Sequence, residues 1–328
     1  MERWPNKPLQ VSEMLDLMFQ IMKKHFPALF LIMIILLVPL FLVQGLALWG
    51  SGFSLIRADV EGPWYMTFMD AGISEDLMAN LPLPQMLILF FSAFVMAIIF
   101  VPLAEAAIII AVDRIRKGEK IQPIAHIKQA FSRFWGLLGG SFVYGIISGG
   151  LVLLVLLILG ALGGLIWFTD GFSGNVLLLV LVILGMIAFG IGGLIGSIYL
   201  SVRISFNFAV IVFEKVSPAL TQSWNLTRKN FWRLFVIALV IMILTGIISS
   251  AFEGLFTLIL GMSVLSTLLS NIVNLFTYLM SFVVYAIVYF DLKLRNEGTD
   301  LQRMMEDYRQ ETFETQGNTI EENIPTDK

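Results

Sequence analysis

The chain has 328 residues, of which 58% are hydrophobic and only 14% are charged, and its formal net charge at pH 7 is -3. A mean hydropathy of +0.86 is too high for a soluble domain, so the composition predicts an integral membrane protein. The chain contains no cysteine, which excludes disulfides, thiolate metal sites and a cysteine nucleophile.

Charge-free apolar runs predict the membrane spans, since a helix needs roughly 20 apolar residues to cross a bilayer. The first run follows a polar segment without a cleavage site, so we expect it to remain as an anchor. The segment Gly254–Ser266 fits three alternatives: an extension of span five, a short re-entrant piece, or the start of span six. Six spans are predicted, at about 27–49, 84–111, 136–166, 175–200, 232–252 and 267–291.

Basic residues are segregated to one side of these spans. They precede span one, lie between spans two and three and between four and five, and follow span six, whereas the opposite loops contain only Arg57. Acidic residues dominate those opposite loops, above all in the segment Asp59–Asp76. The positive-inside rule therefore predicts that both termini are cytoplasmic.

Three amphipathic segments precede spans one, three and five, namely Ser12–His25, Gln122–Arg133 and Val216–Phe235. Each meets a basic or polar residue and then a phenylalanine where the span begins. The repetition predicts three tandem units of an interfacial helix and a two-span hairpin, at about 8–112, 120–202 and 216–298. The expected fold class is therefore all-α: a polytopic membrane domain over residues 1–298, with six transmembrane helices and three amphipathic interfacial helices.

The third amphipathic segment has the most distinct signals. Ser217 and Pro218 are typical of an N-cap and a first helical residue. Leu220, Trp224 and Thr227 are expected on one helix face with Phe231. Aromatic and basic residues suit the interface of an anionic leaflet, and the candidate lipid contacts are Trp224, Arg228, Lys229, Trp232 and Arg233.

The C-terminal residues 299–328 form an acidic cytoplasmic tail in this interpretation. Asp300–Thr312 is expected to continue as a short polar helix. The residues beyond it have few apolar side chains, so we expect them to be disordered.

The sequence contains no recognisable catalytic motif. Its two histidines, His25 and His126, lack a second ligand at metal-binding spacing, and there is neither a G-x-S-x-G nor a Gly-Lys dipeptide. We therefore assign no catalytic, cofactor or metal residues, and we expect no cofactor and no nucleic-acid partner.

Ionisable groups at membrane depth are the main functional candidates. Glu105 follows Pro102 near the end of span two, and Arg203 lies past the core of span four with Asn207 one turn on. If Glu105 and Arg203 pair, they form a gate, a head-group contact or, more commonly, a structural tie. In the alternative without a pair, both side chains extend to the inner membrane interface. Asn271 and Asn274 of span six are expected to hydrogen-bond between helices.

Glycine pairs at four-residue spacing cluster in spans three and four. Such surfaces let helices approach closely, so the expected role is packing within the middle hairpin, with a homo-oligomer or partner interface or a hinge as the alternative. The pairs are Gly145/Gly149, Gly160/Gly164 and Gly192/Gly196.

Three segments resemble a known family. FEKVSPALTQSWNLTRKNFWRLF (Phe213–Phe235), YFDLKLRNEGTDLQ (Tyr289–Gln302) and KPLQVSEMLDLMFQIMKKHF (Lys7–Phe26) are similar to hallmark segments of bacterial multi-pass proteins known as the membrane domain of glycerophosphoryl diester phosphodiesterase. Some members carry a soluble barrel that holds the catalytic residues. No non-membrane segment of this chain is long enough for that barrel, so we do not transfer the enzymatic activity.

Two functions remain open at this stage. The first is a non-enzymatic membrane protein that organises lipid or a partner protein at the inner leaflet, as the repeated basic-aromatic segments suggest. The second is a permease or export component for an amphiphilic, lipid-like small molecule. It would require a polar cavity between spans two, four and six that reaches Glu105 and Arg203.

Overall fold

The structure is a computed structural model that describes residues 8–58, 81–168, 176–214, 219–228 and 230–322, without the side chains of Leu165, Phe168 and 297–322. In these ranges every regular element is a helix, which confirms the all-α fold class. The acidic segment Asp59–Asp76, the predicted cap Ser217–Pro218, and Lys229 lie outside the described residues.

Six described helices are long and apolar enough to cross a membrane, which confirms the predicted number of spans. Span two is interrupted by a single π-helical turn, η1, directly before Pro102, where the missing N–H of proline relaxes the α-helical register. The helices of the six spans are α1 (Val11–Gly50), α4 (Leu83–Val95) with η1 (Met96–Phe100) and α5 (Val101–Arg116), α7 (Phe134–Phe168), α8 (Val176–Ile204), α11 (Phe231–Leu260) and α12 (Val264–Glu322).

The three amphipathic segments take two forms. The first is the N-terminal part of α1, which continues through Pro27 without a break. The second and third are separate short helices, α6 (Pro123–Phe131) and α10 (Leu220–Thr227). The predicted continuous helix through Phe235 is interrupted, because α10 ends at Thr227 and α11 begins at Phe231.

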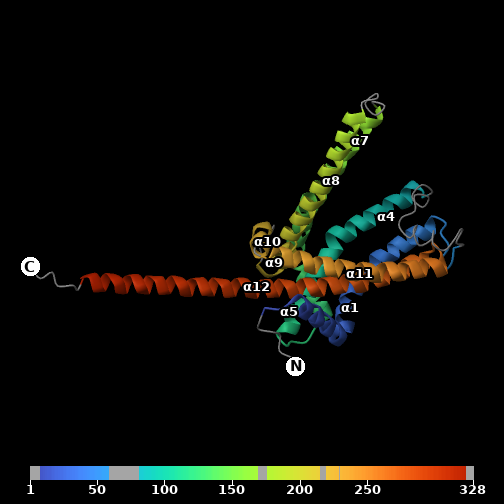
Figure 1. Ribbon diagram of the computed structural model, residues 1–328. Coiled ribbons are helices and arrows are strands. Elements are labelled where there is room, and N and C mark those ends of the chain that lie inside the picture. Colours follow the sequence, from blue (N-terminus) through green and yellow to red (C-terminus); the bar gives the residue numbers. More distant parts are fainter. Residues whose placement is uncertain (1–7, 59–80, 169–175, 215–218, 229, 323–328) are drawn as a thin grey trace, which may run out of the picture.

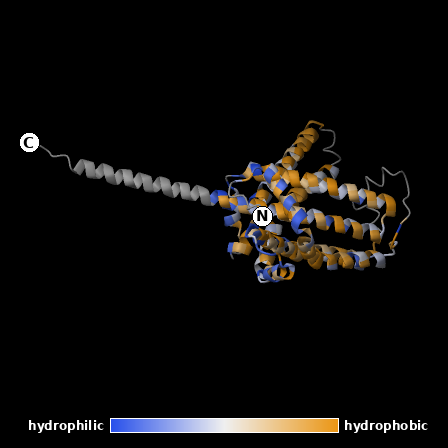
Figure 2. Cartoon of the chain, turned by 90° about the horizontal axis from the view of Figure 1, so that it is seen from below, coloured by the Kyte–Doolittle hydropathy of each residue, from blue (hydrophilic) through white to orange (hydrophobic). Residues whose placement is uncertain are grey.

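The helices pack unequally. α12 packs along both α1 and α11, and α5 lies against α1 and α12 with every residue from Pro102 to Asp113 buried. The hairpin of α7 and α8 projects away from the rest (Figure 1). Hydrophobic residues cover the lengths of the helices, and hydrophilic residues gather where α12 leaves the bundle (Figure 2). We call this the basic end; it carries Arg116, Arg203, Arg233 and Arg295.

Gly261 determines the conformation of the turn after span five. This residue has φ +64°, which L side chains rarely adopt, and a Cβ here would collide with the backbone oxygen of Ala58. Segment 54–58 hydrogen-bonds to this turn, with Ala58 N donating to Leu260 O (2.9 Å) and Val264 N donating to Ser54 O (3.0 Å). Of the three alternatives for Gly254–Ser266, the first part therefore extends span five and the last part begins span six.

The C-terminal helix is longer than predicted. The expected end at Thr312 is wrong, because α12 continues to Glu322. Its tail is rich in Glu and Gln, which have high helix propensity, and it extends a helix that is already formed, so it needs no apolar face.

His126 has a structural role at the basic end, where it stabilises the start of α6. Its Nε2 accepts a hydrogen bond from the backbone N–H of Gln122 (3.1 Å), which caps α6 and requires an unprotonated nitrogen. Burial lowers the pKa of His126, and the nearby positive charge of Arg114 lowers it further. No group of three or more possible metal ligands is present in the described part of the chain.

Candidate functional site

Span four is broken at the basic end, and the break is closed by side chains of other helices. After α8 ends at Ile204, a new helix, α9 (Asn207–Glu214), begins. The hydroxyl of Ser223 on α10 accepts a bond from Phe206 N (3.1 Å) and donates to Arg203 O (3.0 Å). Tyr285 of α12 donates to Ser205 O (2.8 Å). The backbone groups freed by the break are thus satisfied inside the protein, as a membrane requires.

Asn207 is the centre of this closure. Its side chain is 0% exposed. Its Nδ2 donates to Gly140 O of α7 (3.2 Å), and its Oδ1 accepts from Ala219 N, just before α10 (3.0 Å). Asn207 therefore joins three helices and has a structural role; it lines neither of the two large cavities described below.

Arg203 lies in an aromatic box, and it forms no ion pair with a described residue. It is 8% exposed, and its Nε and Nη1 atoms have no hydrogen-bond partner. Its guanidinium carbon lies 5.0 Å from the ring centre of Tyr199, 5.2 Å from that of Trp224 and 5.8 Å from that of Phe231. Cation–π attraction is strong in such a desolvated site, so these rings stabilise the charge in place of a carboxylate.

Glu105 is buried on the central helix α5, and no described residue forms an ion pair with it. The expected pair of Glu105 with Arg203 is therefore not formed: the arginine interacts with rings of α8, α10 and α11 instead. The pairing was inferred from sequence position alone, and helix rotation decides which residues meet.

We expect Glu105→Gln to leave the thermal stability of the detergent-solubilised protein unchanged or higher. Glutamine keeps the size of the side chain and removes the cost of burying a carboxylate without a counter-ion. Glu105→Lys serves as the contrast, since a longer buried cation should prevent folding. A large loss of stability in the glutamine variant would show that this site requires the carboxyl group itself.

The five interfacial candidates separate into different environments. Trp232 is 75% exposed and Arg228 is exposed, so both are available to a membrane surface. Trp224 is partly exposed at the surface, and its ring also lies beside the guanidinium group of Arg203. The fourth, Lys229, is not described. The fifth, Arg233, is engaged within the protein and is not a free lipid contact.

Arg233 forms part of a buried ion cluster around Asp291, whose side chain is only 1% exposed. Arg233 Nη1 lies 2.7 Å and Arg295 Nε 2.8 Å from Asp291 Oδ2, and Leu9 N donates to Asp291 Oδ1 (2.7 Å). Both arginines also donate to Leu9 O. The cluster joins the three segments that carried the family resemblance. Asp291 was not among the predicted site residues. Its position four residues before Arg295, at a basic helix end, does indicate an ion pair within one helix.

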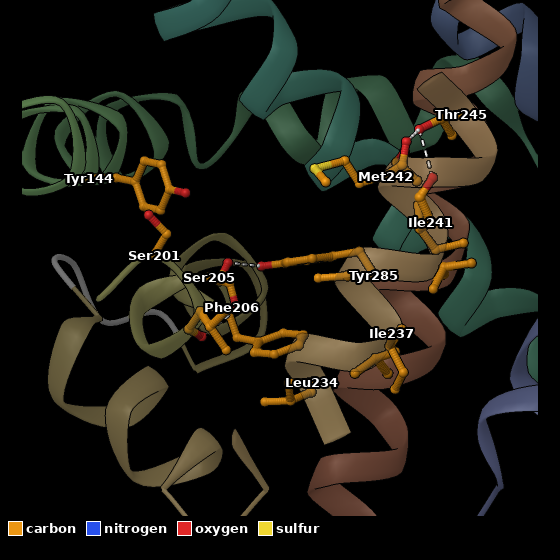
Figure 3. Close-up of a pocket in the computed structure, with 15 residues that line it drawn as sticks. Tyr144, Ser201, Ser205, Phe206, Leu234, Ile237, Ile241, Met242, Thr245 and Tyr285 are labelled. Carbon is orange, nitrogen blue, oxygen red and sulfur yellow. Dashed lines mark hydrogen bonds between the residues drawn. The ribbon is translucent and has the colours of Figure 1, made fainter. Parts of the chain in front are cut away.

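A cavity of about 470 Å³ lies between the projecting hairpin α7–α8 and the pair α11–α12. We call it the inner cavity. One side has Tyr144, Ser201 and Phe206, and the other has apolar residues of α11, including Ile237 and Ile241 (Figure 3). Met242 also lines it and is 64% exposed, so the cavity opens at the lipid-facing surface of the bundle. Its volume is within the range of about 300–1,000 Å³ for ligand pockets.

The predicted glycine pairs do not pack the middle hairpin. A Cβ on any of these six residues would meet no neighbouring atom within 4 Å. The close contacts are made by other glycines: a Cβ on Gly190 would lie 3.5 Å from Leu159, and one on Gly193 would collide with Val155. The expected packing role is therefore wrong for the predicted pairs, which face away from the partner helix.

Fold and helix lengths define the class of this chain as an all-α, multi-pass membrane protein. Comparisons with protein-family models, curated proteins and solved structures find no match, so the resemblance stated above stays a prediction.

Proposed function

We propose that this protein binds a phospholipid of the inner leaflet, with an acyl chain in the inner cavity, and so organises lipid at that leaflet. The observation that supports this is the inner cavity itself. It is lined mainly by apolar side chains, and it opens at the surface of helices that cross the membrane. An acyl chain can enter it from the bilayer without crossing water.

The basic end supplies groups for the lipid head. Leu234 and Val288 line the cavity, and Leu234 lies in the first turn of α11, which also carries the exposed Trp232. Arg228 is exposed just before that helix. The positive-inside rule orients this end to the cytoplasm, where anionic lipids attract basic residues by about 1 kcal/mol each.

The test fills the cavity from its open side. Ala238 lines the cavity and is exposed, so Ala238→Trp should displace the chain without disrupting the core. We expect severalfold less co-purifying phospholipid by mass spectrometry of the gently purified protein. A phospholipid with a photoreactive acyl chain should label segments 234–245 and 281–288 in the original protein and not in the variant.

The matched control is Ile243→Trp, on an exposed part of the same helix that does not line the cavity. It should retain the lipid. Equal lipid retention and labelling in the original protein and the Ala238 variant would contradict the proposal.

The permease hypothesis, in the form derived from the sequence, receives less support. It required a polar cavity between spans two, four and six that reaches Glu105 and Arg203. The inner cavity lies between spans three to six, and neither residue lines it. Lipid binding is therefore the function that this geometry favours.

A further inference from the structure

The contact between α11 and α12 carries polar side chains along most of its length. On α11, Thr245, Ser249, Glu253 and Thr257 follow one another at four-residue spacing, which places them on one face. Along α12 the polar residues are three or four positions apart, which also keeps them on one face. We call the two rows together the polar seam; the second row is Ser263, directly before α12, and Thr267, Ser270, Asn274, Thr277, Ser281 and Tyr285.

A second cavity, of about 580 Å³, lies at the end of the seam opposite the basic end, between α1, α4, α11 and α12. We call it the distal cavity. Its lining is somewhat more polar than that of the inner cavity and includes Gln44, Glu253, Asn271 and Asn274. The Nδ2 atom of Asn271 is buried and has no hydrogen-bond partner, and Glu253 forms no ion pair with a described residue. These groups suit a ligand that offers an acceptor to the amide and a positive charge to the carboxyl group.

The two cavities reach the same seam from its two ends. The inner cavity extends to Thr245 and Ser281, and the distal cavity extends to Glu253 and Asn274. Thr245 and Glu253 are two helical turns apart, which is a rise of about 12 Å. The cavities are therefore separated by a short constriction within the membrane-spanning part of the helices.

One hydrogen-bonded layer forms this constriction. Ser249 Oγ donates to Asn274 Oδ1 (3.1 Å) and lies 3.4 Å from Thr277 Oγ1. Hydrogen bonding between α11 and α12 explains why these three positions are polar, and it confirms the expected role of Asn274. It does not explain the polar residues on either side, which line cavities. Several of those bond only to their own helix: Thr245 donates to Ile241 O (2.7 Å) and Ser281 to Thr277 O (3.0 Å). Their oxygens keep a free lone pair for a passing donor.

We propose that the protein moves phospholipid head groups between the two leaflets along the polar seam, while the acyl chains stay in apolar surroundings, first in the inner cavity and then in the bilayer. Phospholipids with an amine in the head group fit best, because the ammonium group matches Glu253 and the phosphate matches the free amide of Asn271. The inner cavity is the cytoplasmic end of this route, so the inference rests there on the proposed function. Passage requires the layer of Ser249, Asn274 and Thr277 to open.

The test uses the full chain in vesicles of phosphatidylethanolamine and phosphatidylglycerol. A trace of phosphatidylethanolamine with a fluorophore on its acyl chain reports which leaflet it occupies, because dithionite bleaches only the outer leaflet. With the protein present, bleaching should proceed beyond the outer-leaflet fraction. Ser249→Leu should slow this second phase roughly tenfold or more, because the larger side chain overfills the constriction.

Ser250→Leu is the matched control. Ser250 is the next residue on α11, it is exposed, and its hydroxyl bonds only to α11 backbone oxygens. This variant should move lipid at the original rate. Glu253→Gln should slow the labelled phosphatidylethanolamine more than labelled phosphatidylglycerol, which has no amine.

Two results would overturn the inference: bleaching no faster than in protein-free vesicles, or equal rates for the Ser249 and Ser250 variants. Lipid retention in the inner cavity is measured on the same preparations. If lipid is retained and the head groups do not move, the inference fails and the proposed function stands. If the lipid is not retained, the proposed function itself fails.

Discussion

Replacing Asp291 with alanine is expected to lower the free energy of unfolding by about 3–5 kcal/mol, the usual cost of breaking a buried ion pair from one side. The carboxylate is the shared partner of Arg233, Arg295 and the N–H of Leu9. Its loss leaves two largely buried cations and a backbone donor without an acceptor. It also disconnects the N-terminal segment from the start of span five and from the end of span six.

The measurement is reversible unfolding of the purified protein in mixed micelles, followed by circular dichroism. Glu119→Gln is the control, because the Arg114–Glu119 pair is exposed on both sides and should contribute no more than about 1 kcal/mol. If the Asp291 variant unfolds with no greater loss than the Glu119 variant, the cluster does not hold the basic end together.

Asn207→Ala is expected to cost roughly 2–4 kcal/mol, since it leaves the buried N–H of Ala219 without a partner and creates a small void. The surrounding chain has little freedom to refill this void. Gly140 packs so closely here that a Cβ on it would lie 2.8 Å from Asn207 Nδ2 and 2.5 Å from Ile211 Cδ1. We further expect α10 to detach, because Asn207 holds its first turn.

Detachment is measurable by proteolysis or by hydrogen exchange of segment 219–227, alongside unfolding in micelles. Asn225→Ala is the matched control, because Asn225 is exposed on α10, and its loss should change stability by less than about 0.5 kcal/mol. Normal protection of α10 in the Asn207 variant would mean that Ser223 and Thr227 alone hold this helix in place.

The polar residues show where prediction from the sequence ends. Glu105 and Arg203 are both buried in the structure, but their partners were not predictable. A helix places its side chains about 100° apart, so a small rotation decides whether an arginine meets a carboxylate or three aromatic rings. The cluster of Asp291 required contacts between residues separated by most of the chain. The polar seam was present in the sequence as two periodic rows, yet only the packing of α11 on α12 shows that the rows face each other.

The glycine pairs illustrate the same limit. Four-residue spacing indicates a smooth helix face, but it does not say which way that face points. In the structure the contact faces of α7 and α8 run through Gly190 and Gly193, beside the predicted motif.

The sequence by itself determined the class of the protein and the six spans. A long apolar segment crosses the hydrocarbon core of a membrane as a helix, because a helix pairs every backbone N–H and C=O within the segment. The break between α10 and α11, the continuous first helix and the two cavities were decided only by the tertiary structure. The break between α8 and α9 was decided in the same way, because side chains of distant segments, Ser223 and Tyr285, satisfy the backbone oxygens that this break leaves free.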